Sequence, residues 1–335
     1  MRLPVVAVLL PAALFARCDV LPPTLVSPES AGLKPAPVAE LVAAVRASGT
    51  TSFAVLKDGK LIAAFNEHQP LNVYSISKAV TSLAAGRLFT TGRWTNIDAP
   101  LSSLLPGFDT DPKGPITLRQ LMSHTSGIRD ARDSAGHVTR EWNTARDRLA
   151  LARTLPIATP PGAAFKYNNQ GPFLVAAAVE HATSERLHPF LLRTLFEPMC
   201  IAKSSWLTDR TGRAAGYAGL TISAFDLAKL GQLLLNRGLW GSQRLLSEEW
   251  IRLSALSSSQ TVNKNVGLLW FLHWTPDFPL PLIVHHSGDG GQYLYVFPNH
   301  NIVVARLRDS GDATPAQSMD DLPKRIVDAL IRQQR

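Results

Sequence analysis

The sequence predicts a protein of the α/β class, α+β type, in which an antiparallel sheet is flanked by N- and C-terminal helices and carries an inserted all-helical region. Three observations predict this fold. Apolar runs typical of strands occur near both ends of the chain, and helical periodicity fills the middle. Further helical patterns precede the first strand runs and follow the last ones. The chain has 335 residues, 45% hydrophobic and 18% charged, which suffices for a large buried core.

The first 20 residues, MRLPVVAVLLPAALFARCDV, have the pattern of an export signal. Arg2 precedes an apolar run that is too short and too often interrupted by Pro for a membrane span of about 20 residues. Cys18 is a lipidation candidate, but Arg17 precedes it where small residues are expected, so lipidation is disfavoured. We expect a periplasmic or secreted protein with no stable membrane span after signal removal, while an N-terminal extension of a cytoplasmic protein stays open as the alternative.

Removal of this segment would leave Cys200 as the one remaining cysteine. We therefore expect no intramolecular disulfide. The apolar neighbours in LFEPMCIAKSSW favour a buried structural cysteine over a catalytic thiol.

The sheet region is predicted from residues 21–65 and 257–335. A helical pattern over Val38–Ser48 precedes SFAVLKDGKLIAAF, in which two apolar runs flank Asp58-Gly59, a strong hairpin signal. Near the C-terminus, four strand patterns are followed by a closing helix, namely VGLLWFLHW, LIVHHSG, GQYLYVF and NIVVARLR, then DLPKRIVDALIRQQ. Because strands of one sheet then come from both ends of the chain, we expect a single antiparallel layer.

Residues 66–256 form the mainly helical region. Its helical patterns include SKAVTSLAAGRLF, ITLRQLM, GPFLVAAAVEHAT, LHPFLLRTLF, SAFDLAKLGQLLLNRG and SEEWIRLS, separated by turns such as LLPGF and TPPGAAF. We expect the two regions to form one domain overall, with any cleft where they meet.

Charge and motif content exclude several classes of partner. The net charge is +8, but basic residues are scattered among acids, as in RDARDSAGHVTREWNTARDR, and no basic stripe with interleaved aromatic residues occurs, so we expect no nucleic-acid partner. Neither H-E-x-x-H nor H-x-H-x-D occurs, and the adjacent His285 and His286 would point to opposite faces of a strand. We therefore expect no metal and no cofactor.

Ser75 and Lys78 form the one S-x-x-K in the chain, at the start of a helical pattern. Residues three apart share a helix face, and a Ser in the first turn places its hydroxyl beside unpaired backbone N–H groups. Lys78 can act as a base for that hydroxyl only when desolvated, and the following AVTSLAAG would bury the helix. The alternative interpretation is that Ser75 caps the helix and Lys78 is solvated.

Two further motifs carry polar groups. PPGAAFKYNNQG places Tyr167 and Asn169, as Y-x-N, on a loop before an apolar helix, although the Tyr ring could simply pack. VHHSGDGGQ places His286, Ser287 and Gly288 at a strand end before a Gly-rich turn, which either brings backbone close to a ligand or simply makes a hairpin.

In this order, S-x-x-K, Y-x-N and a small-residue-Gly strand motif resemble the serine β-lactamase and penicillin-binding-protein superfamily. The resemblance is greatest to its class C branch, which includes class C β-lactamases, D-Ala-D-Ala carboxypeptidases, β-lactamase-like esterases and 6-aminohexanoate-dimer hydrolase. It covers nearly the whole mature chain and extends to the segments ITLRQLMSHTSGI, PGAAFKYNN and GGQYLYVFPNHNIVVARL. It implies a β-lactamase/transpeptidase-like fold and a serine hydrolase that acts through an acyl-enzyme.

The resemblance also implies roles for individual residues. Ser75 would be the nucleophile, Lys78 its proton acceptor, and Tyr167 the phenol that passes a proton to the leaving group and later activates water. The oxyanion hole would be formed by the backbone N–H groups of Ser75 and Asp289. The residues implied in substrate binding are Asn169, His286, Ser287 and Gly288. For His124 in LMSHTSGI, the alternative of a base for Ser126 gives way to a structural histidine.

One departure bears on the substrate. His286 stands where many relatives have the Lys of K-T-G, and a His is neutral for much of the time near pH 7. A permanent cation for a substrate carboxylate is then missing, which favours small-molecule ester or amide substrates over β-lactams. The alternatives are a catalytically weak penicillin-binding or peptidoglycan sensor and a D-Ala-D-Ala carboxypeptidase. The sequence does not indicate the physiological substrate or the oligomeric state.

Overall fold

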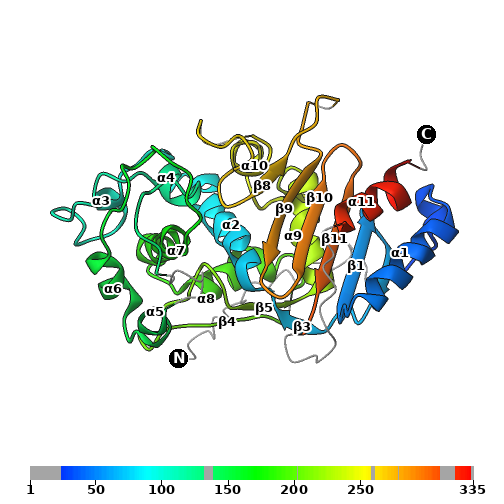
Figure 1. The fold of residues 1–335 in the computed structure, drawn as a ribbon, viewed down its shortest axis with the longest axis horizontal. Helices are drawn as coiled ribbons and strands as arrows, with labels where there is room; N and C mark the ends of the chain where they lie inside the picture. The colour runs from blue at the N-terminus through cyan, green and yellow to red at the C-terminus, as the bar shows by residue number, and fades with distance from the viewer. Residues whose placement is uncertain are drawn as a thin grey trace, which may run out of the picture.

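A six-stranded antiparallel sheet occupies one half of the molecule and helices fill the other half (Figure 1). The computed structural model describes residues 24–131, 139–201, 203–257, 261–277, 279–309 and 321–332. The strand order is β2-β1-β11-β10-β9-β8. Their bounds are β1 Ser52–Lys57, β2 Lys60–Phe65, β8 Phe271–His273, β9 Ile283–Gly288, β10 Gln292–Phe297 and β11 Ile302–Leu307. The predicted α+β class is confirmed.

The sheet joins the two ends of the chain, as predicted. β1 and β2 form the hairpin around Asp58 and Gly59, both of which have positive φ, 51° and 71°, as a tight two-residue turn requires. β1 then pairs along its whole length with β11, from Ser52 opposite Leu307 to Lys57 opposite Ile302. The N-terminal hairpin is therefore held by the C-terminal strands.

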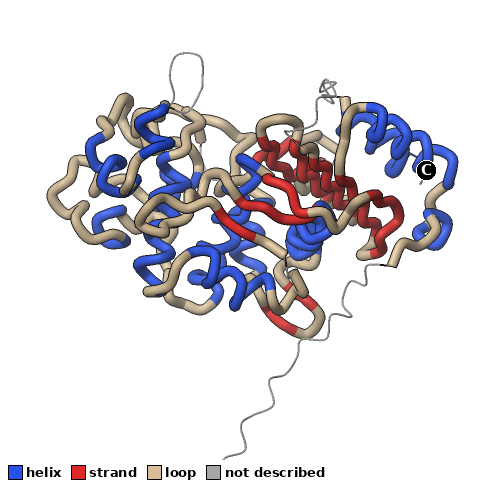
Figure 2. The backbone as a smooth tube through the Cα atoms, turned by 90° about the horizontal axis from the view of Figure 1, so that it is seen from below, coloured by secondary structure: helices blue, strands red, loops and turns tan. Residues whose placement is uncertain are grey.

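Each face of the sheet is covered by helices. One face packs against α1 (Pro35–Ala47), α11 (Leu322–Ile326) and its continuation η5 (Val327–Ile331) in a separate hydrophobic cluster. The other face packs against α9 (Ala224–Leu235), whose Gly231 lets the helix approach the side chain of Val303. Figure 2 shows the strands between these two groups of helices. α9 comes from the mainly helical stretch of sequence, yet it covers the sheet.

The helical half is built around two helices, α2 (Ser77–Thr90) and α7 (Gln170–Thr183). Eleven of the 14 residues of each helix are buried, on all sides of the helix, so both are core helices. The shorter helices around them are α3 Leu101–Leu104, α4 Leu118–Met122, α5 Arg140–Thr144, α6 Arg148–Thr154, α8 Leu187–Leu191, η4 Leu192–Phe196 and α10 Glu248–Ala255. Single turns of 3₁₀ helix occur at η2 Pro28–Ala31 and η3 Tyr74–Ile76.

Two small sheets inside this region were not predicted. β3 (Pro70–Asn72), β5 (Leu220–Ser223) and β4 (Ser205–Trp206) form one, and β6 (Leu239–Trp240) pairs with β7 (Gln243–Arg244) in the other. Strands of two to four residues are too short to show an alternating pattern in the sequence. In the first of these sheets, β3 ends at Asn72, just before the turn that carries Ser75.

The N-terminal predictions fall outside the described part of the chain, which begins at residue 24. The export signal over residues 1–20 and the lipidation candidate Cys18 therefore stay predictions. In the structure Cys200 is disulfide-bonded and half-buried rather than fully buried, whereas the expectation of a lone thiol concerns the chain after removal of residues 1–20 and stays a prediction. That expectation assumed removal of the segment that carries the other cysteine of the chain.

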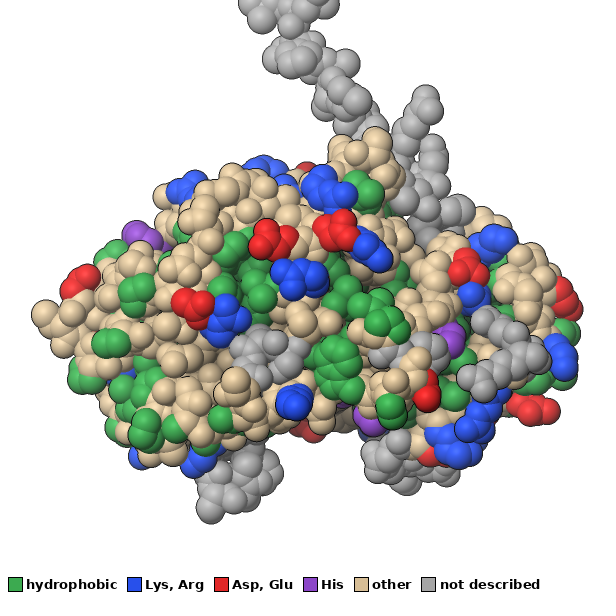
Figure 3. Space-filling view, turned by 90° about the horizontal axis from the view of Figure 1, so that it is seen from above, with side chains coloured by type: hydrophobic (Ala, Val, Ile, Leu, Met, Phe, Trp, Pro, Cys, Tyr) green, Lys and Arg blue, Asp and Glu red, His purple; other side chains and the backbone are tan. Residues whose placement is uncertain are grey.

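The surface agrees with the scattered charge seen in the sequence. Figure 3 shows Lys and Arg side chains beside Asp and Glu on the face viewed from above, with apolar side chains between them. Among the described residues, no helix combines the length and the apolar character that crossing a bilayer demands.

Candidate active site

Ser75 lies in the 3₁₀ turn η3, immediately before α2. The turn is strained at Tyr74, a non-glycine residue with a φ of 46°. It is held by Ser77, whose Oγ donates to the Tyr74 carbonyl at 2.6 Å and accepts from the N–H of Leu220 at 3.1 Å. α2 begins at Ser77 without a side-chain cap, so the alternative interpretation of Ser75 as the helix cap is wrong.

Lys78 is fully buried and hydrogen-bonded to Ser75. Its Nζ donates to the Ser75 Oγ at 3.1 Å and to the backbone carbonyl of Tyr217 at 2.9 Å, and none of its surface is exposed. The Nζ also lies 4.7 Å from the ring centroid of Tyr167 and 5.7 Å from that of Tyr217. The alternative of a solvated Lys78 is therefore wrong.

Tyr167 lies on the loop before α7, half-buried, as the sequence predicted. Its ring packs against that of His124 at 4.6 Å between centroids. His124 is buried and its Nδ1 accepts the N–H of Asn168 at 3.3 Å, which ties this loop to the end of α4. The Oγ of Ser126 accepts the N–H of Ile128 at 3.4 Å and is buried. His124 thus packs against Tyr167 and holds its loop, in keeping with a structural role.

Strand β9 approaches the Ser75 turn at Gly288. A Cβ at Gly288 would stand 2.4 Å from the carbonyl oxygen of Val73, so only glycine permits this approach. The next residue, Asp289, is exposed and begins the turn after β9, where its Oδ1 accepts the N–H of Gly290 at 3.0 Å. Asp289 therefore follows directly after Gly288, the residue through which β9 contacts the Ser75 turn.

His286 is buried on the face of β9 that points toward Lys78. Its Nδ1 lies 2.8 Å from the Ser287 carbonyl, and because a carbonyl only accepts, Nδ1 carries the hydrogen. Burial, and next the charge of Lys78, lower the pKa of His286 well below its usual value of 6.5. His286 is therefore a neutral imidazole, as the sequence suggested.

His285 lies on the opposite face of the sheet. It stands across from Tyr295, whereas His286 stands across from Leu294. Burial, and secondarily the nearby His273, lower the pKa of His285 to about 4. Within the described residues, no three His, Cys, Asp or Glu side chains are grouped so that they could hold a metal ion.

The remaining predicted binding residues lie nearby. Asn169 is buried at the N-cap position, directly before α7, and its N–H donates to the Asp130 Oδ1 at 3.5 Å. Ser287 is exposed, and its side chain alternates with that of His286 along β9. Their part in substrate binding stays a prediction.

Sequence reasoning missed two aromatic residues beside Lys78 and Tyr167. Tyr217 supplies the carbonyl that accepts from Lys78 and belongs to a segment without regular structure. Phe271, at the start of β8, lies 6.2 Å from the Tyr167 ring and 5.2 Å from the His286 ring. The only sequence signal for Tyr217 is the pair of glycines, Gly216 and Gly219, on either side of it.

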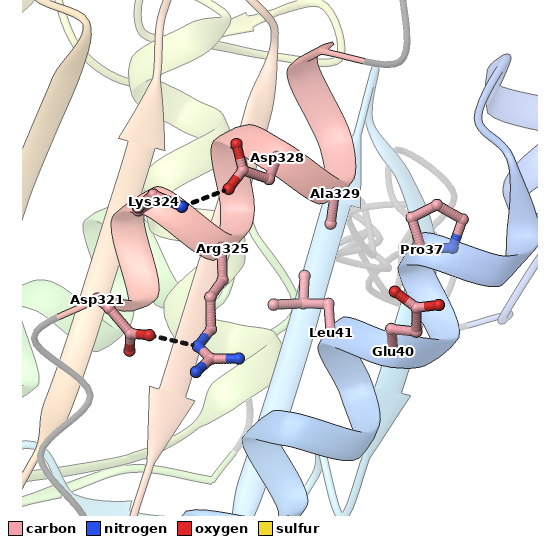
Figure 4. A pocket seen from close by; sticks show the side chains of 8 residues that line it. All are labelled: Pro37, Glu40, Leu41, Asp321, Lys324, Arg325, Asp328 and Ala329. Carbon is pink, nitrogen blue, oxygen red and sulfur yellow. Dashed lines mark hydrogen bonds and ion pairs between the residues drawn. The ribbon is translucent and has the colours of Figure 1, made fainter.

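A groove with a volume of about 500 Å³ lies away from this site, between α1 and α11 (Figure 4). Lys324 and Arg325 of α11 pair with the flanking Asp328 at 3.0 Å and Asp321 at 2.7 Å, and Glu40 of α1 also lines the groove. None of its lining residues is a Ser, Cys, His or Tyr, so it offers no hydroxyl, thiol or imidazole for acyl transfer.

Comparisons with known proteins match most of the chain. The family model described as Beta-lactamase matches residues 38–327. Protein flp of Staphylococcus aureus (strain MRSA252) is 26% identical over 137 residues, which are 40% of this chain and only 27% of flp. A solved structure described as "Putative 6-aminohexanoate-dimer hydrolase from Bacillus anthracis" has a TM-score of 0.75 and 20% identity, covering 88% of this chain and 82% of that one. "EstCE1, a hydrolase with promiscuous acyltransferase activity" has a TM-score of 0.70 and 17% identity, covering 90% and 98%. At these identities the structural likeness shows the fold alone.

Proposed function

We propose that this chain, which belongs to the β-lactamase family, is a serine hydrolase that cleaves ester or amide bonds through an acyl-enzyme on Ser75. The family match agrees with the resemblance seen in the motifs. The observation that carries the proposal is the hydrogen bond of 3.1 Å from a fully buried Lys78 amine to the Ser75 hydroxyl. A nucleophile and a desolvated base in contact are the requirement for serine acyl transfer.

In the proposed reaction, the Ser75 Oγ attacks the acyl carbon of the substrate and its proton passes to Lys78. The negative charge that forms on the carbonyl oxygen is received by the backbone N–H groups of Ser75 and Asp289. Loss of one such donor typically costs about 2.7 to 4 kcal/mol of barrier. The bond to the leaving group then breaks, and the leaving oxygen or nitrogen takes a proton by way of Tyr167.

Water completes the cycle. Tyr167 passes its proton to the neutral Lys78 amine as it takes one from water, and the hydroxide that results attacks the acyl carbon. The bond between the acyl carbon and the Ser75 Oγ then breaks, and Lys78 returns a proton to that oxygen, which restores the hydroxyl. A free tyrosine has a pKa of about 10 and is a weak base, so its placement 4.7 Å from the Lys78 Nζ is what supports this role.

The neutral His286 bears on the substrate class. With its Nδ1–H bonded to the Ser287 carbonyl and its pKa lowered by burial, His286 offers no cation to a substrate carboxylate. Substrates without a carboxylate beside the scissile bond fit this site better than β-lactams or peptides that carry one. We therefore propose ester or amide hydrolysis as the main activity.

Intact mass measurement after treatment with a fluorophosphonate or with penicillin tests the proposal, with Ser75→Ala as the control. Labelling that depends on Ser75, together with turnover of a short-chain aryl ester, is the expected result. Stable labelling without turnover would instead favour a penicillin-binding sensor. Absence of labelling would refute the hydrolase proposal.

Turnover of nitrocefin against that of the aryl ester tests the substrate class. We expect a higher rate on the ester. Nitrocefin turnover far above ester turnover would overturn the argument from His286. The His286→Lys variant is the matched comparison, because it restores a cation at this position and should shift the ratio toward nitrocefin.

We also propose that the protein acts after export to the periplasm or to the medium. The support is the leader pattern of residues 1–20 in the sequence. Mass spectrometry of the N-terminus of the protein from each cell fraction tests this, and an intact Met1 in a cytoplasmic fraction alone would contradict it.

A further inference from the structure

Tyr217 connects Lys78 to the helical half of the molecule. Its backbone carbonyl accepts from the Lys78 Nζ at 2.9 Å, and its side-chain Oη accepts from the Trp142 Nε1 at 2.9 Å. The Tyr217 ring itself lies 5.7 Å from the Lys78 Nζ. One residue thus contacts the buried amine with its backbone and an indole on another element with its side chain.

The backbone around Tyr217 is irregular but held on both sides, because the Thr81 Oγ1 donates to the Gly216 carbonyl at 2.7 Å and the Leu207 N–H donates to the Gly219 carbonyl at 2.9 Å. Gly216 and Gly219 flank it with φ values of 68° and 84°, and residues 215–219 belong to no helix or strand. Glycines in such conformations leave the peptide between them more conformational freedom than other residues would. The Tyr217 side chain therefore adds an anchor to a backbone that these hydrogen bonds already restrain.

Trp142 is a rigid anchor for this purpose. It lies on α5 and is fully buried, and its ring packs edge-on against Phe173 of α7 at 5.4 Å between centroids. Its own carbonyl accepts from the Arg148 Nε at 3.2 Å. A side chain held by two helices cannot follow Tyr217 if that residue moves.

We propose that the Trp142–Tyr217 hydrogen bond is a positioning device for Lys78. By fixing the Tyr217 side chain, it aims the Tyr217 carbonyl at the Lys78 Nζ and so keeps the amine within 3.1 Å of the Ser75 Oγ. Tyr217 and Trp142 act through Lys78 and are positioning residues. The inference rests on the proposed function, since it assigns a catalytic consequence to the placement of Lys78.

The chain offers a matched control for a purely structural role. Trp206 is also buried, and its Nε1 donates at 2.8 Å to the carbonyl of Ala218, the residue next to Tyr217. Trp206→Phe therefore removes an indole hydrogen bond from the same segment without touching the residue that contacts Lys78. Loss of either bond leaves a buried polar group without a partner and should lower stability to a similar extent.

The experiment compares Tyr217→Phe, Trp142→Phe and Trp206→Phe with the wild type. Tyr217→Phe keeps the ring and the carbonyl and removes only the acceptor of the Trp142 N–H. The second-order rate constant for fluorophosphonate labelling of Ser75 is measured by intact mass across pH 6 to 9, together with the melting temperature. Misplacement of a reacting group by about 1 Å costs on the order of 100-fold in rate, so we expect losses between about tenfold and 100-fold for the first two variants.

Trp206→Phe should label within about twofold of the wild type despite a similar loss of melting temperature. The Trp142→Phe, Tyr217→Phe double variant should label no more slowly than the slower single variant, because both changes remove one interaction. Wild-type labelling rates in Tyr217→Phe, or equal losses in Trp206→Phe, would overturn the positioning role while leaving the proposed function intact. Absence of Ser75 labelling in the wild type would refute the proposed function and the positioning role with it.

Discussion

Substitution of Gly288 by Ala should slow acylation of Ser75 without unfolding the protein. The added Cβ would stand 2.4 Å from the Val73 carbonyl oxygen, 1.0 Å inside the 3.4 Å at which ordinary contact begins. Either β9 or the turn from Val73 to Ser75 must therefore move by a large part of this distance. Both sides of the contact carry proposed oxyanion donors, the N–H groups of Asp289 and Ser75.

The magnitude follows from that displacement. A shift of about 1 Å between reacting groups costs on the order of 100-fold in rate, which is about 2.7 kcal/mol of barrier. Overpacking itself costs typically about 1 to 3 kcal/mol of stability, which a chain with two large hydrophobic clusters tolerates. We therefore expect a folded variant whose acylation is about 100-fold slower.

Gly290→Ala is the control variant that distinguishes the effect of the steric clash at Gly288 from the effect of backbone strain in the turn. Gly290 has a φ of 74°, so Ala there is strained by about 1 to 2 kcal/mol, but the nearest atom to its Cβ is 3.8 Å away on the flexible side chain of Gln292. The assay is the rate constant of fluorophosphonate labelling, with the melting temperature measured in parallel. Wild-type labelling in Gly288→Ala, or an equal loss in Gly290→Ala, would refute the argument that close approach of β9 to the turn sets the oxyanion geometry.

Two further predictions concern Lys78 and His285. Lys78→Met leaves the Ser75 hydroxyl without its base and should slow labelling by about 100-fold to 10,000-fold; a rate near that of the wild type would show that another group takes the Ser75 proton. Because the pKa of His285 is about 4 in the fold against 6.5 in the unfolded chain, the unfolded state binds the proton first as pH falls, and about 3 kcal/mol of stability present above pH 6.5 should be lost toward pH 4. Urea unfolding at pH 7.5 and 4.5 measures this loss, which should be smaller in His285→Gln; an unchanged pH dependence in that variant would contradict the assignment.

The parts of the fold that the sequence predicted have local signals. The hairpin at Asp58-Gly59 requires two residues that tolerate positive φ, and the sequence supplies them. The long strands and α7 carry periodic or continuous apolar patterns of sufficient length. Pairing of β1 with β11 could be inferred because strand patterns occur only near the two ends.

The details of the site had weaker signals. The sequence placed Ser75 in the first turn of the helix, whereas it lies in a separate 3₁₀ turn whose strained residue is Tyr74. Nothing in the spacing of residues predicts that a non-glycine residue will adopt a positive φ, because tertiary contacts impose it. Tyr217 was missed for a related reason, since its functional atom is a backbone carbonyl and every residue has one.

The burial of Lys78 explains why these missed features matter. An amine removed from water loses hydration that the protein must replace, and the sequence predicted the burial without what compensates for it. In the structure the replacement comes from the Tyr217 carbonyl, the Ser75 hydroxyl and two tyrosine rings, whose centroids lie 4.7 and 5.7 Å from the Nζ. Tyr167 and Tyr217 lie far from Lys78 along the chain, so the environment of Lys78 is set by contacts distant in sequence from the S-x-x-K motif. A substitution at either tyrosine should therefore change the reactivity of Ser75 through Lys78, which both tyrosines contact.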